Sequence, residues 1–352
     1  MRNGTSLSEL GEFGFIKRIA GRITPGAGVV LGIGDDAAAI EPVPGRLGLV
    51  TSDMMVEGVH FDLSFCDAVS LGKKALAVNL SDIAAMGGEP RQFLLSLAVP
   101  PSLSLDFLDE FIRGMLQRAG EFGVALIGGD TCSSPERMVL SVTVLGDQLP
   151  ERIVRRSGAR PGDRICVTGT VGDSALGLAL LRKGTREGAA VARHLDPTPR
   201  VREGRALAEA GIPSAMIDIS DGLLADLGHI LDLSSVGAQL YTDKLPLSSH
   251  FLAHFPDADQ ASLSMALTGG EDYELLFTAP PEKIPAVFAL MEEFGTPVAV
   301  IGTITAEREL TVSGADGEEF AVRGKGYDHF SASNRTGRPE MRGLRQSCEK
   351  RP

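Results

Sequence analysis

Residues 215–226 read A-M-I-D-I-S-D-G-L-L-A-D. A short apolar run delivers Asp218, and the chain then turns through Ser220 and Asp221 into a predicted helix. This pattern places the carboxylates between the carboxyl end of a strand and the start of a helix, where a side chain is rigidly held yet faces a crevice. Taken alone, the turn favours a simpler interpretation, in which Ser220 and Asp221 only cap the helix.

Similar acidic turns recur along the chain, and they change this interpretation. They are Gly34-Asp35-Asp36, Thr51-Ser52-Asp53, Asn79-Leu80-Ser81-Asp82 and Gly128-Gly129-Asp130-Thr131. Carboxylates gathered in glycine-rich turns repel one another unless a hard cation lies among them. The repeated pattern therefore predicts a site for several Mg²⁺ ions.

Length and composition indicate a globular protein of two domains. The chain has 352 residues, which is long for a single core, and 43% of them are hydrophobic. We find no apolar run near the roughly 20 residues that a membrane span needs. The first residues mix charges into their apolar positions, which is not typical of a secretory signal.

Charge and cysteine content exclude further classes of protein. The formal net charge of −12 argues against broad nucleic-acid binding, although a phosphate substrate is compatible with it if metal ions neutralise the phosphate. The four cysteines are scattered without C-x-x-C spacing, which favours reduced thiols over zinc ligands or disulfides. We therefore expect a cytoplasmic protein without a membrane or nucleic-acid partner.

Residues 68–86 are predicted to form a helix that Asp67 caps. Asn79 and Asp82 stand three residues apart and so share one face of it. The residues around them are nearly all apolar, and a buried Asp82 without a partner would be costly. Asp82 either caps a neighbouring backbone turn or holds a metal ion, and the other acidic turns favour the metal.

Alternating predicted strands and helices give the fold class α/β (α+β) with two domains, residues 1–147 and 148–330. An Arg-, Pro- and Gly-rich segment around residues 150–162 is predicted to link them. Its Arg156 is either a solvated residue or a guanidinium directed at a nucleotide phosphate. Residues 331–352 are predicted to form a disordered basic tail.

Common phosphate-binding and catalytic signatures are missing from the sequence. There is no G-x-x-x-x-G-K-[ST] loop and no protein-kinase signature. The Gly-x-Gly at residues 32–34 lacks a third glycine and is followed by two acids, the wrong charge for a bare pyrophosphate. The chemistry that remains is metal-dependent phosphoryl transfer, in which positioning and charge neutralisation supply most of the catalysis.

A set of longer motifs occurs in one order along the chain: G-I-G-D-D-A, T-S-D-M-M-V-E-G-V-H-F, K-A-L-A-V-N-L-S-D-I-A-A-M-G, I-G-G-D-T, I-D-I-S-D-G-L, G-G-E-D-Y-E-L and K-G-Y-D-H-F. With these motifs the chain closely resembles the thiamine-monophosphate kinase family, of the aminoimidazole-ribonucleotide-synthetase-like superfamily. The resemblance runs from about residue 9 to about residue 330.

The resemblance implies ATP-dependent phosphorylation of thiamine monophosphate to thiamine diphosphate with several Mg²⁺ ions. It implies a homodimer whose amino-terminal mixed sheets pair, and a carboxy-terminal α/β domain that completes the nucleotide groove. The family's metal-binding positions match Asp36, Thr51, Ser52, Asp53, Asp82, Asp130, Asp218 and Asp221, of which Asp53 and Asp218 are expected to be the most critical. Its nucleotide contacts match Gly129, Asp130, Arg156 and Ser220, and its positions near the thiamine phosphate match His60, Glu271 and Tyr327.

Three of these positions need comment. Ser52 replaces an expected threonine, but a serine hydroxyl still binds magnesium; the effect of Met54 and Met55, where Thr-Leu is common, stays open. Tyr327 either stacks on a thiamine ring or belongs to the core. His60 is equally compatible with a structural histidine.

Other functions fit less well. A selenophosphate synthetase should carry a reactive Cys or selenocysteine in a glycine-rich amino-terminal loop, and this sequence has none there. A hydrogenase-maturation relative should end in cysteine, whereas the last residues here are Arg351 and Pro352. The motifs G-G-E-D-Y-E-L and K-G-Y-D-H-F point away from an aminoimidazole-ribonucleotide synthetase. A non-catalytic scaffold would be expected to have lost some of the acidic positions, and all are present.

Overall fold

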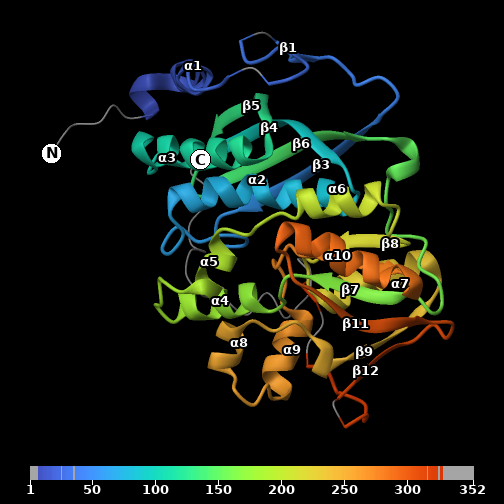
Figure 1. The fold of residues 1–352 in the computed structure, drawn as a ribbon. Coiled ribbons are helices and arrows are strands. Elements are labelled where there is room, and N and C mark those ends of the chain that lie inside the picture. The colour runs from blue at the N-terminus through green and yellow to red at the C-terminus, as the bar shows by residue number, and fades with distance from the viewer. Residues whose placement is uncertain (1–6, 25, 35, 315, 324–325, 328–352) are drawn as a thin grey trace, which may run out of the picture.

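Helix α2 (Ala68–Ala85) lies between the amino-terminal sheet and the carboxy-terminal domain (Figure 1). Asp67 caps it as predicted, by accepting a hydrogen bond from the Ser70 backbone N–H at 2.9 Å. Gly72 lets a neighbouring helix approach closely, because a Cβ there would come within 2.0 Å of the Phe111 carbonyl oxygen. The helix is buried along most of its length and forms a wall that both domains share.

The structure is a computed structural model that describes residues 7–24, 26–34, 36–314, 316–323 and 326–327. The predicted basic tail, residues 331–352, lies outside the described residues. None of the described helices is long and apolar enough to cross a membrane.

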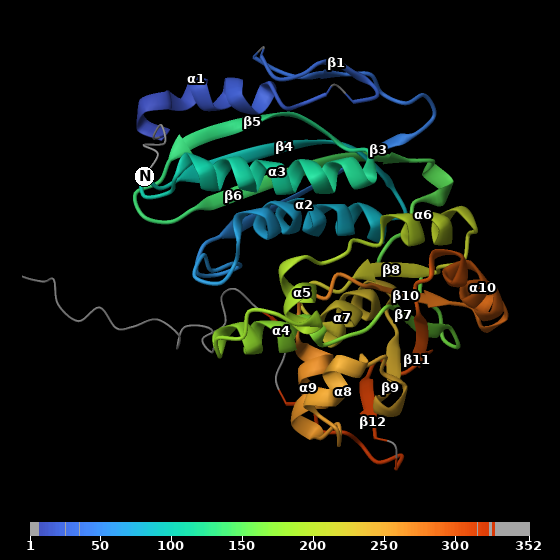
Figure 2. The same ribbon diagram turned by 60° about the vertical axis from the view of Figure 1, so that its left-hand side comes forward.

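The amino-terminal sheet has the strand order β3-β6-β4-β5. Its first three strands pair antiparallel, and β5 joins β4 in parallel, so the sheet is mixed. Helices α2 and α3 cover one face, while α1 and the β1–β2 pair lie beside β5 (Figure 2). The bounds are α1 (Leu7–Ala20), β1 (Val29–Leu31), β2 (Ala39–Ile40), β3 (Leu47–Val56), β4 (Glu89–Val99), α3 (Leu105–Phe122), β5 (Ala125–Ser133) and β6 (Val139–Gln148).

Strand β3 sends alternate side chains to the two faces of this sheet. Leu49 and Met55 are buried toward α2, and Asp53 shares their face. Val50 and Met54 point the other way and are 69% and 61% exposed. The sheet therefore has one face packed against helices and one open face.

The carboxy-terminal domain contains a sheet of order β12-β9-β11-β7-β10-β8, antiparallel except for the β12–β9 pair. Together the two sheets confirm the predicted α/β (α+β) class with two domains. The bounds are β7 (Arg164–Thr168), α4 (Asp173–Arg182), α5 (Ala189–Leu195), α6 (Val201–Glu209), β8 (Ala215–Asp218), α7 (Leu223–Ser234), β9 (Gly237–Tyr241), α8 (Ser249–His254), α9 (Gln260–Thr268), β10 (Leu275–Ala279), α10 (Ile284–Phe294), β11 (Val298–Thr305) and β12 (Leu310–Ser313).

The two domains share one continuous apolar core around α2. Gly204 of α6 lies so close to α2 that a Cβ there would come within 2.2 Å of the Ala84 carbonyl oxygen. At the other end of the interface, Asp196 pairs with Lys73 of α2 and with Arg118 of α3. This packing fixes the orientation of the domains and places α2 against β8.

Several short elements were not predicted from the sequence, namely β1, β2, α5, α8, α9 and β12. Helix α5 has 7 residues and α8 has 6. Elements of this length contain too few repeats of the apolar period for the pattern to be recognised. Helix α2 falls within one residue of its predicted bounds, residues 68–86, whereas β3 and β5 run several residues past the predicted strand ends at Thr51 and Ile127.

Candidate active site

A cavity of about 990 Å³ lies between α2 and β3 on one side and the carboxy-terminal domain on the other. Residues from both domains line it, and they include many of the predicted site residues. These are Asp53, His60, Asp82, Asp218, Ser220, Asp221, Glu271 and Tyr327. The fold therefore brings together acids that are far apart in the sequence, although Asp53 lies within β3 and Asp82 within α2 rather than in the predicted turns.

The acids that line the cavity face one another across the domain boundary. Burial, the charge of Asp82 and that of Asp221 raise the pKa of Asp53 to about 6. Burial and the charge of Asp82 raise the pKa of Asp218 to about 8, against the opposing effect of a 2.6 Å hydrogen bond from the Ser81 hydroxyl. Burial is thus the first cause of these shifts, and the charge of neighbouring carboxylates is the second.

Asp82 sits at the centre of this group. Burial raises its pKa, while the Thr51 hydroxyl, which donates a hydrogen bond to its carboxylate, and the charge of Arg156 act to lower it. Thr51 and Arg156 do not themselves line the cavity, but both act on a carboxylate that does.

The acids suit hard divalent cations by their donor type and charge. Oxygen ligands are those that Mg²⁺ prefers, and carboxylates with raised pKa values gain most from a nearby cation. Within the described residues, however, no three Asp, Glu, His or Cys side chains converge closely enough to hold a metal ion as they stand.

Other predicted metal and nucleotide positions lie outside this cavity. Asp36 is exposed in the segment between β1 and β2. Gly129 and Asp130 are exposed on β5, where Asp130 pairs in register with Ser96. The Ser52 side chain is on the open face of the sheet, opposite to Asp53, and its hydroxyl is 2.9 Å from that of Thr143.

The turn that follows Asp218 is organised by Asp226, which sequence reasoning missed. One carboxylate oxygen of Asp226 accepts hydrogen bonds from the backbone N–H groups of Ser220, Asp221 and Gly222, at 3.0 to 3.1 Å. Gly222 is the N-cap residue of α7 and no side chain caps the helix there, so the interpretation of Ser220 and Asp221 as its caps is wrong. The available signal was an acid in the first helical turn, where the helix dipole favours negative charge.

The G-G-E-D-Y-E loop is locked onto this same turn. The Glu271 N–H donates to the Ser220 carbonyl and the Tyr273 N–H donates to the Ile219 carbonyl, both at 2.8 Å. Glu271 and Tyr273 have φ angles of +67° and +51°, a backbone region that residues other than glycine rarely adopt. A Cβ on Gly270 would come within 2.3 Å of the Ser220 carbonyl oxygen, so only glycine allows this approach.

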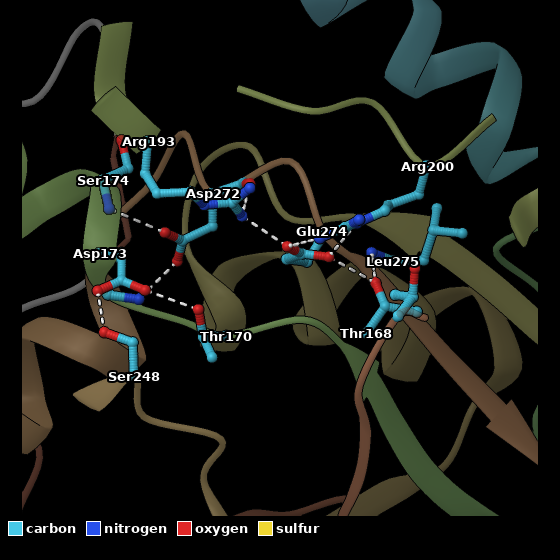
Figure 3. Close-up of polar contacts among 12 residues, drawn as sticks. Thr168, Thr170, Asp173, Ser174, Arg193, Arg200, Ser248, Asp272, Glu274 and Leu275 are labelled. Atoms are coloured by element: carbon cyan, nitrogen blue, oxygen red, sulfur yellow. Dashed lines mark hydrogen bonds and ion pairs between the residues drawn. The ribbon is translucent and has the colours of Figure 1, made fainter. Parts of the chain in front are cut away.

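Two further acids of this loop hold the domain together rather than face the cavity (Figure 3). Asp272 accepts hydrogen bonds from the backbone of Gly172 at 2.7 Å and of Ser174 at 3.1 Å, at the start of α4. Glu274 is fully buried and is bound by Arg193 and Arg200, as Figure 3 shows. The sequence alone did not separate these structural acids from Glu271.

Glu271 lines the cavity together with His60, Tyr327 and several apolar side chains. Glu271 is 3.0 Å from the ammonium nitrogen of Lys74. His60 accepts a hydrogen bond from the Val56 backbone N–H through Nδ1, at 3.0 Å. Tyr327 is 42% exposed and is anchored by a 2.9 Å bond from its backbone N–H to the Asp221 carbonyl. The apolar lining residues include Val59, Val78, Leu178 and Met265.

Comparison with known proteins matches both domains to one family. The N-terminal domain of AIR synthase related proteins matches residues 34–147, and the C-terminal domain of the same family matches residues 160–314. Together these two matches cover most of the chain.

Several individual relatives are thiamine-monophosphate kinases. The thiamine-monophosphate kinase of Salmonella typhimurium is 40% identical over 328 residues, which cover 91% of this chain and 98% of that protein. The crystal structure of thiamine-monophosphate kinase from Stenotrophomonas maltophilia has a TM-score of 0.78 at 39% identity, and the match covers 87% of this chain and 96% of that one. AaThiL complexed with AMPPCP and TMP has a TM-score of 0.72 at 34% identity, over 92% of this chain and 98% of that one.

Proposed function

This chain belongs to the thiamine-monophosphate kinase family, and we propose that it phosphorylates thiamine monophosphate to thiamine diphosphate with ATP, by direct in-line transfer. The observation that carries the proposal is the cavity in which Asp53 and Asp82 of one domain meet Asp218 and Asp221 of the other. The similarity to a protein that was solved with AMPPCP, an ATP analogue, and TMP supports the choice of substrates.

The reaction needs little acid–base chemistry from the protein. The acceptor is a phosphate oxygen that is already ionised near neutral pH, so no general base is assigned. A bond forms between this oxygen and the γ-phosphorus of ATP, while the bond from the γ-phosphorus to the bridging oxygen breaks and ADP leaves with that oxygen. The main obstacle is repulsion between two anions, and the site must reduce it.

Asp53, Asp82, Asp218 and Asp221 are proposed to hold several Mg²⁺ ions in the cavity, with Asp53 and Asp218 the most critical. When bound, these ions supply positive charge that offsets the charge of both phosphates. The metal positions at Asp36, Thr51, Ser52 and Asp130 rest on the family resemblance. Thr51 orients Asp82 through its hydrogen bond, which is compatible with that role.

The remaining residues are proposed to bind the two substrates. Gly129, Asp130, Arg156 and Ser220 are assigned to ATP from the resemblance; Ser220 lines the cavity and Arg156 lies within electrostatic reach of Asp82. His60, Glu271 and Tyr327 are assigned to the thiamine phosphate. His60 and Tyr327 both lie near Glu271, and apolar side chains line the same cavity, which supports the assignment because thiamine carries two flat rings that require apolar and aromatic contacts.

We also propose that the chain acts as a homodimer that pairs through the open face of the amino-terminal sheet. Val50 and Met54 on this face are 69% and 61% exposed, unusually high for large apolar side chains on a sheet. A Val50→Glu variant should shift the protein from dimer to monomer in size-exclusion chromatography with light scattering. If the wild-type protein is a monomer at micromolar concentration, the dimer proposal is wrong.

One assay tests the function directly. Purified protein is incubated with Mg²⁺, ATP and either thiamine or thiamine monophosphate, and the products are separated by chromatography. We expect thiamine diphosphate from the monophosphate and little product from free thiamine. In a second arm with γ-³²P-ATP, label that stays on the protein after acid quench and gel filtration would contradict direct transfer.

A further inference from the structure

Lys74 of α2 is a fully buried ammonium group that the proposed function does not yet use. The residue is 1% exposed and does not line the cavity. Its nitrogen is 3.0 Å from Oε1 of Glu271, which does line the cavity and whose side chain is 27% exposed. A buried ammonium is costly unless it is paired, so the position of Lys74 is tied to the charge of Glu271.

His194 of α5 approaches the other oxygen of the same carboxylate. Its Nδ1 is 3.4 Å from Glu271 Oε2 and 3.0 Å from the Ser174 hydroxyl. Burial and the charge of Lys74 lower the pKa of His194 to about 3, so the imidazole is neutral. Because an ionised carboxylate can only accept, the attractive arrangement is the tautomer that carries its proton on Nδ1.

The backbone of Glu271 is fixed independently of these two contacts. Its φ angle of +67° is strained, and its N–H is bonded to the Ser220 carbonyl at 2.8 Å. Glu271 is thus held by its backbone on one side and by Lys74 and His194 at its two carboxylate oxygens. Burial acts to raise the pKa of Glu271, but the charge and the hydrogen bond of Lys74 act against it, and the pKa lies below its usual value.

This arrangement selects what Glu271 can recognise. Lys74 pairs with one carboxylate oxygen of Glu271 and His194 lies beside the other, and the charge of Lys74 cancels much of the charge of Glu271. The lone pairs that remain toward the cavity are therefore suited to accept a hydrogen bond from an N–H group rather than to attract a bare cation. Thiamine offers such a donor, the amino group on its pyrimidine ring.

We propose that Lys74 and His194 are positioning residues that orient ionised Glu271 to accept a hydrogen bond from the amino group of the thiamine pyrimidine ring. The inference rests on the proposed function, and it deepens it by naming the group that distinguishes this acceptor from other phosphates. Both act through Glu271: Lys74 lies outside the cavity lining, and His194, which lines the cavity, has its Nδ1 within 3.4 Å of the Glu271 carboxylate.

The test compares thiamine monophosphate with oxythiamine monophosphate, in which oxygen replaces the amino group of the pyrimidine ring. A site that accepts this N–H should prefer thiamine monophosphate by about 100-fold in kcat/KM, because the oxygen analogue leaves the carboxylate unpaired. In Lys74→Met and in Glu271→Gln the preference should fall below about 10-fold, while the KM for ATP changes by less than about twofold.

Lys73→Met is the matched control. Lys73 is the neighbouring residue on α2 and pairs with Asp196 at 3.1 Å, away from the cavity. The Lys73→Met variant should keep the full preference for thiamine monophosphate over oxythiamine monophosphate. A loss of preference in both lysine variants would show a general effect of disturbing α2 and would overturn the proposal.

A double variant keeps the test valid if Lys74→Met fails to fold because Glu271 is left with an unpaired charge. Lys74→Met combined with Glu271→Gln removes both charges. If Lys74 acts through Glu271, the double variant should have the same substrate preference as Glu271→Gln alone, since the effects of mutating contacting residues are not additive. A double variant that retains the wild-type preference overturns the proposal.

His194 supplies a second comparison. His194→Asn keeps an N–H donor near the position of Nδ1 and should retain the preference within about threefold, whereas His194→Leu should reduce it about tenfold. Equal preference in the two variants contradicts a positioning role. Wild-type protein without activity on thiamine monophosphate would remove the proposed function itself, whereas an active wild type that does not discriminate between the two phosphates overturns this inference alone.

Discussion

Asp218 and Asp226 belong to one strand–turn–helix segment, and both are nearly fully buried, at 3% and 2% exposure. Asp226 accepts three backbone N–H bonds from the turn between them. Asp218 instead has the Ser81 hydroxyl and faces Asp82 of the other domain. Burial raises the pKa of both carboxyl groups, to about 8 for Asp218 and about 7 for Asp226.

The same contrast extends to the rest of the site. Asp272 and Glu274 are enclosed by backbone N–H groups and arginines, and they hold α4 and β10 in place. Asp53 and Asp82 have fewer partners of opposite charge and line the cavity. Carboxylates with internal partners therefore build the frame, while carboxylates whose neighbours are other carboxylates are available to a cation.

The largest effect is expected from removing one of the carboxylates that line the cavity and have other carboxylates as neighbours. Asp218→Asn and Asp53→Asn should lower kcat by about 10³-fold or more, because each removes a ligand charge from the reaction centre. The melting temperature should stay the same or rise, since repulsion between the acids is relieved. Steady-state kinetics at saturating Mg²⁺ with thermal unfolding measures both, and near wild-type turnover would contradict the assigned cluster.

Removing a carboxylate that has internal partners should lower stability and leave the response to Mg²⁺ nearly unchanged. Glu274→Gln leaves Arg193 without its carboxylate partner and leaves Arg200 with only Glu203, at 3.4 Å. Breaking such a pair costs about 3–5 kcal/mol of unfolding free energy. Urea unfolding should show the loss, and the folded fraction should retain a KM for Mg²⁺ close to that of the wild type. A weakened response to Mg²⁺ at full stability would place Glu274 in the cation site instead.

The pH dependence of stability sharpens the comparison further. The pKa of Asp218 is raised from 3.8 to about 8 in the folded state, so its stabilising contribution is complete below 3.8 and is lost as the pH rises through about 8. In metal-free buffer, Asp218→Asn should therefore gain melting temperature relative to the wild type on going from about pH 5.5 to about pH 8.5. Added Mg²⁺ should stabilise the wild type more at the higher pH, since fewer protons compete.

If the difference in melting temperature between Asp218→Asn and the wild type stays constant from about pH 5.5 to about pH 8.5, Asp218 is already ionised without metal. Thermal unfolding by calorimetry, in chelator and then in excess Mg²⁺, gives both curves on the same samples.

The smallest effect separates two neighbouring hydroxyls on β3. The Thr51 hydroxyl bonds to Asp82, whereas that of Ser52 lies on the opposite face near Thr143. Thr51→Ala should raise the KM for Mg²⁺ by about tenfold, the effect of one hydrogen bond to a charged group. Ser52→Ala should change it by less than about threefold if its hydroxyl stays on the open face. A larger effect of Ser52→Ala would show that this side chain reaches the metal site in the assembled enzyme.

The long elements could be predicted from the sequence because their signals are local. The apolar period and the Asp67 cap defined α2, and the recurring acidic segments marked Asp53, Asp82 and Asp218, although these residues lie in β3, α2 and β8 rather than in turns. The motifs also carried the family and its chemistry. Short helices such as α8 were missed, because one or two turns do not establish a period.

The role of each acid could only be seen in the tertiary structure. In the sequence, Glu271, Asp272 and Glu274 are consecutive members of one acidic loop, yet they face respectively the cavity, the start of α4 and two arginines. Long-range packing of α2 against β8 creates the meeting of Asp82 with Asp218. The sequence specifies which residues can carry charge, but the charge becomes functional or structural according to the partners that packing places within a few ångströms, because Coulomb energy and desolvation depend on those distances.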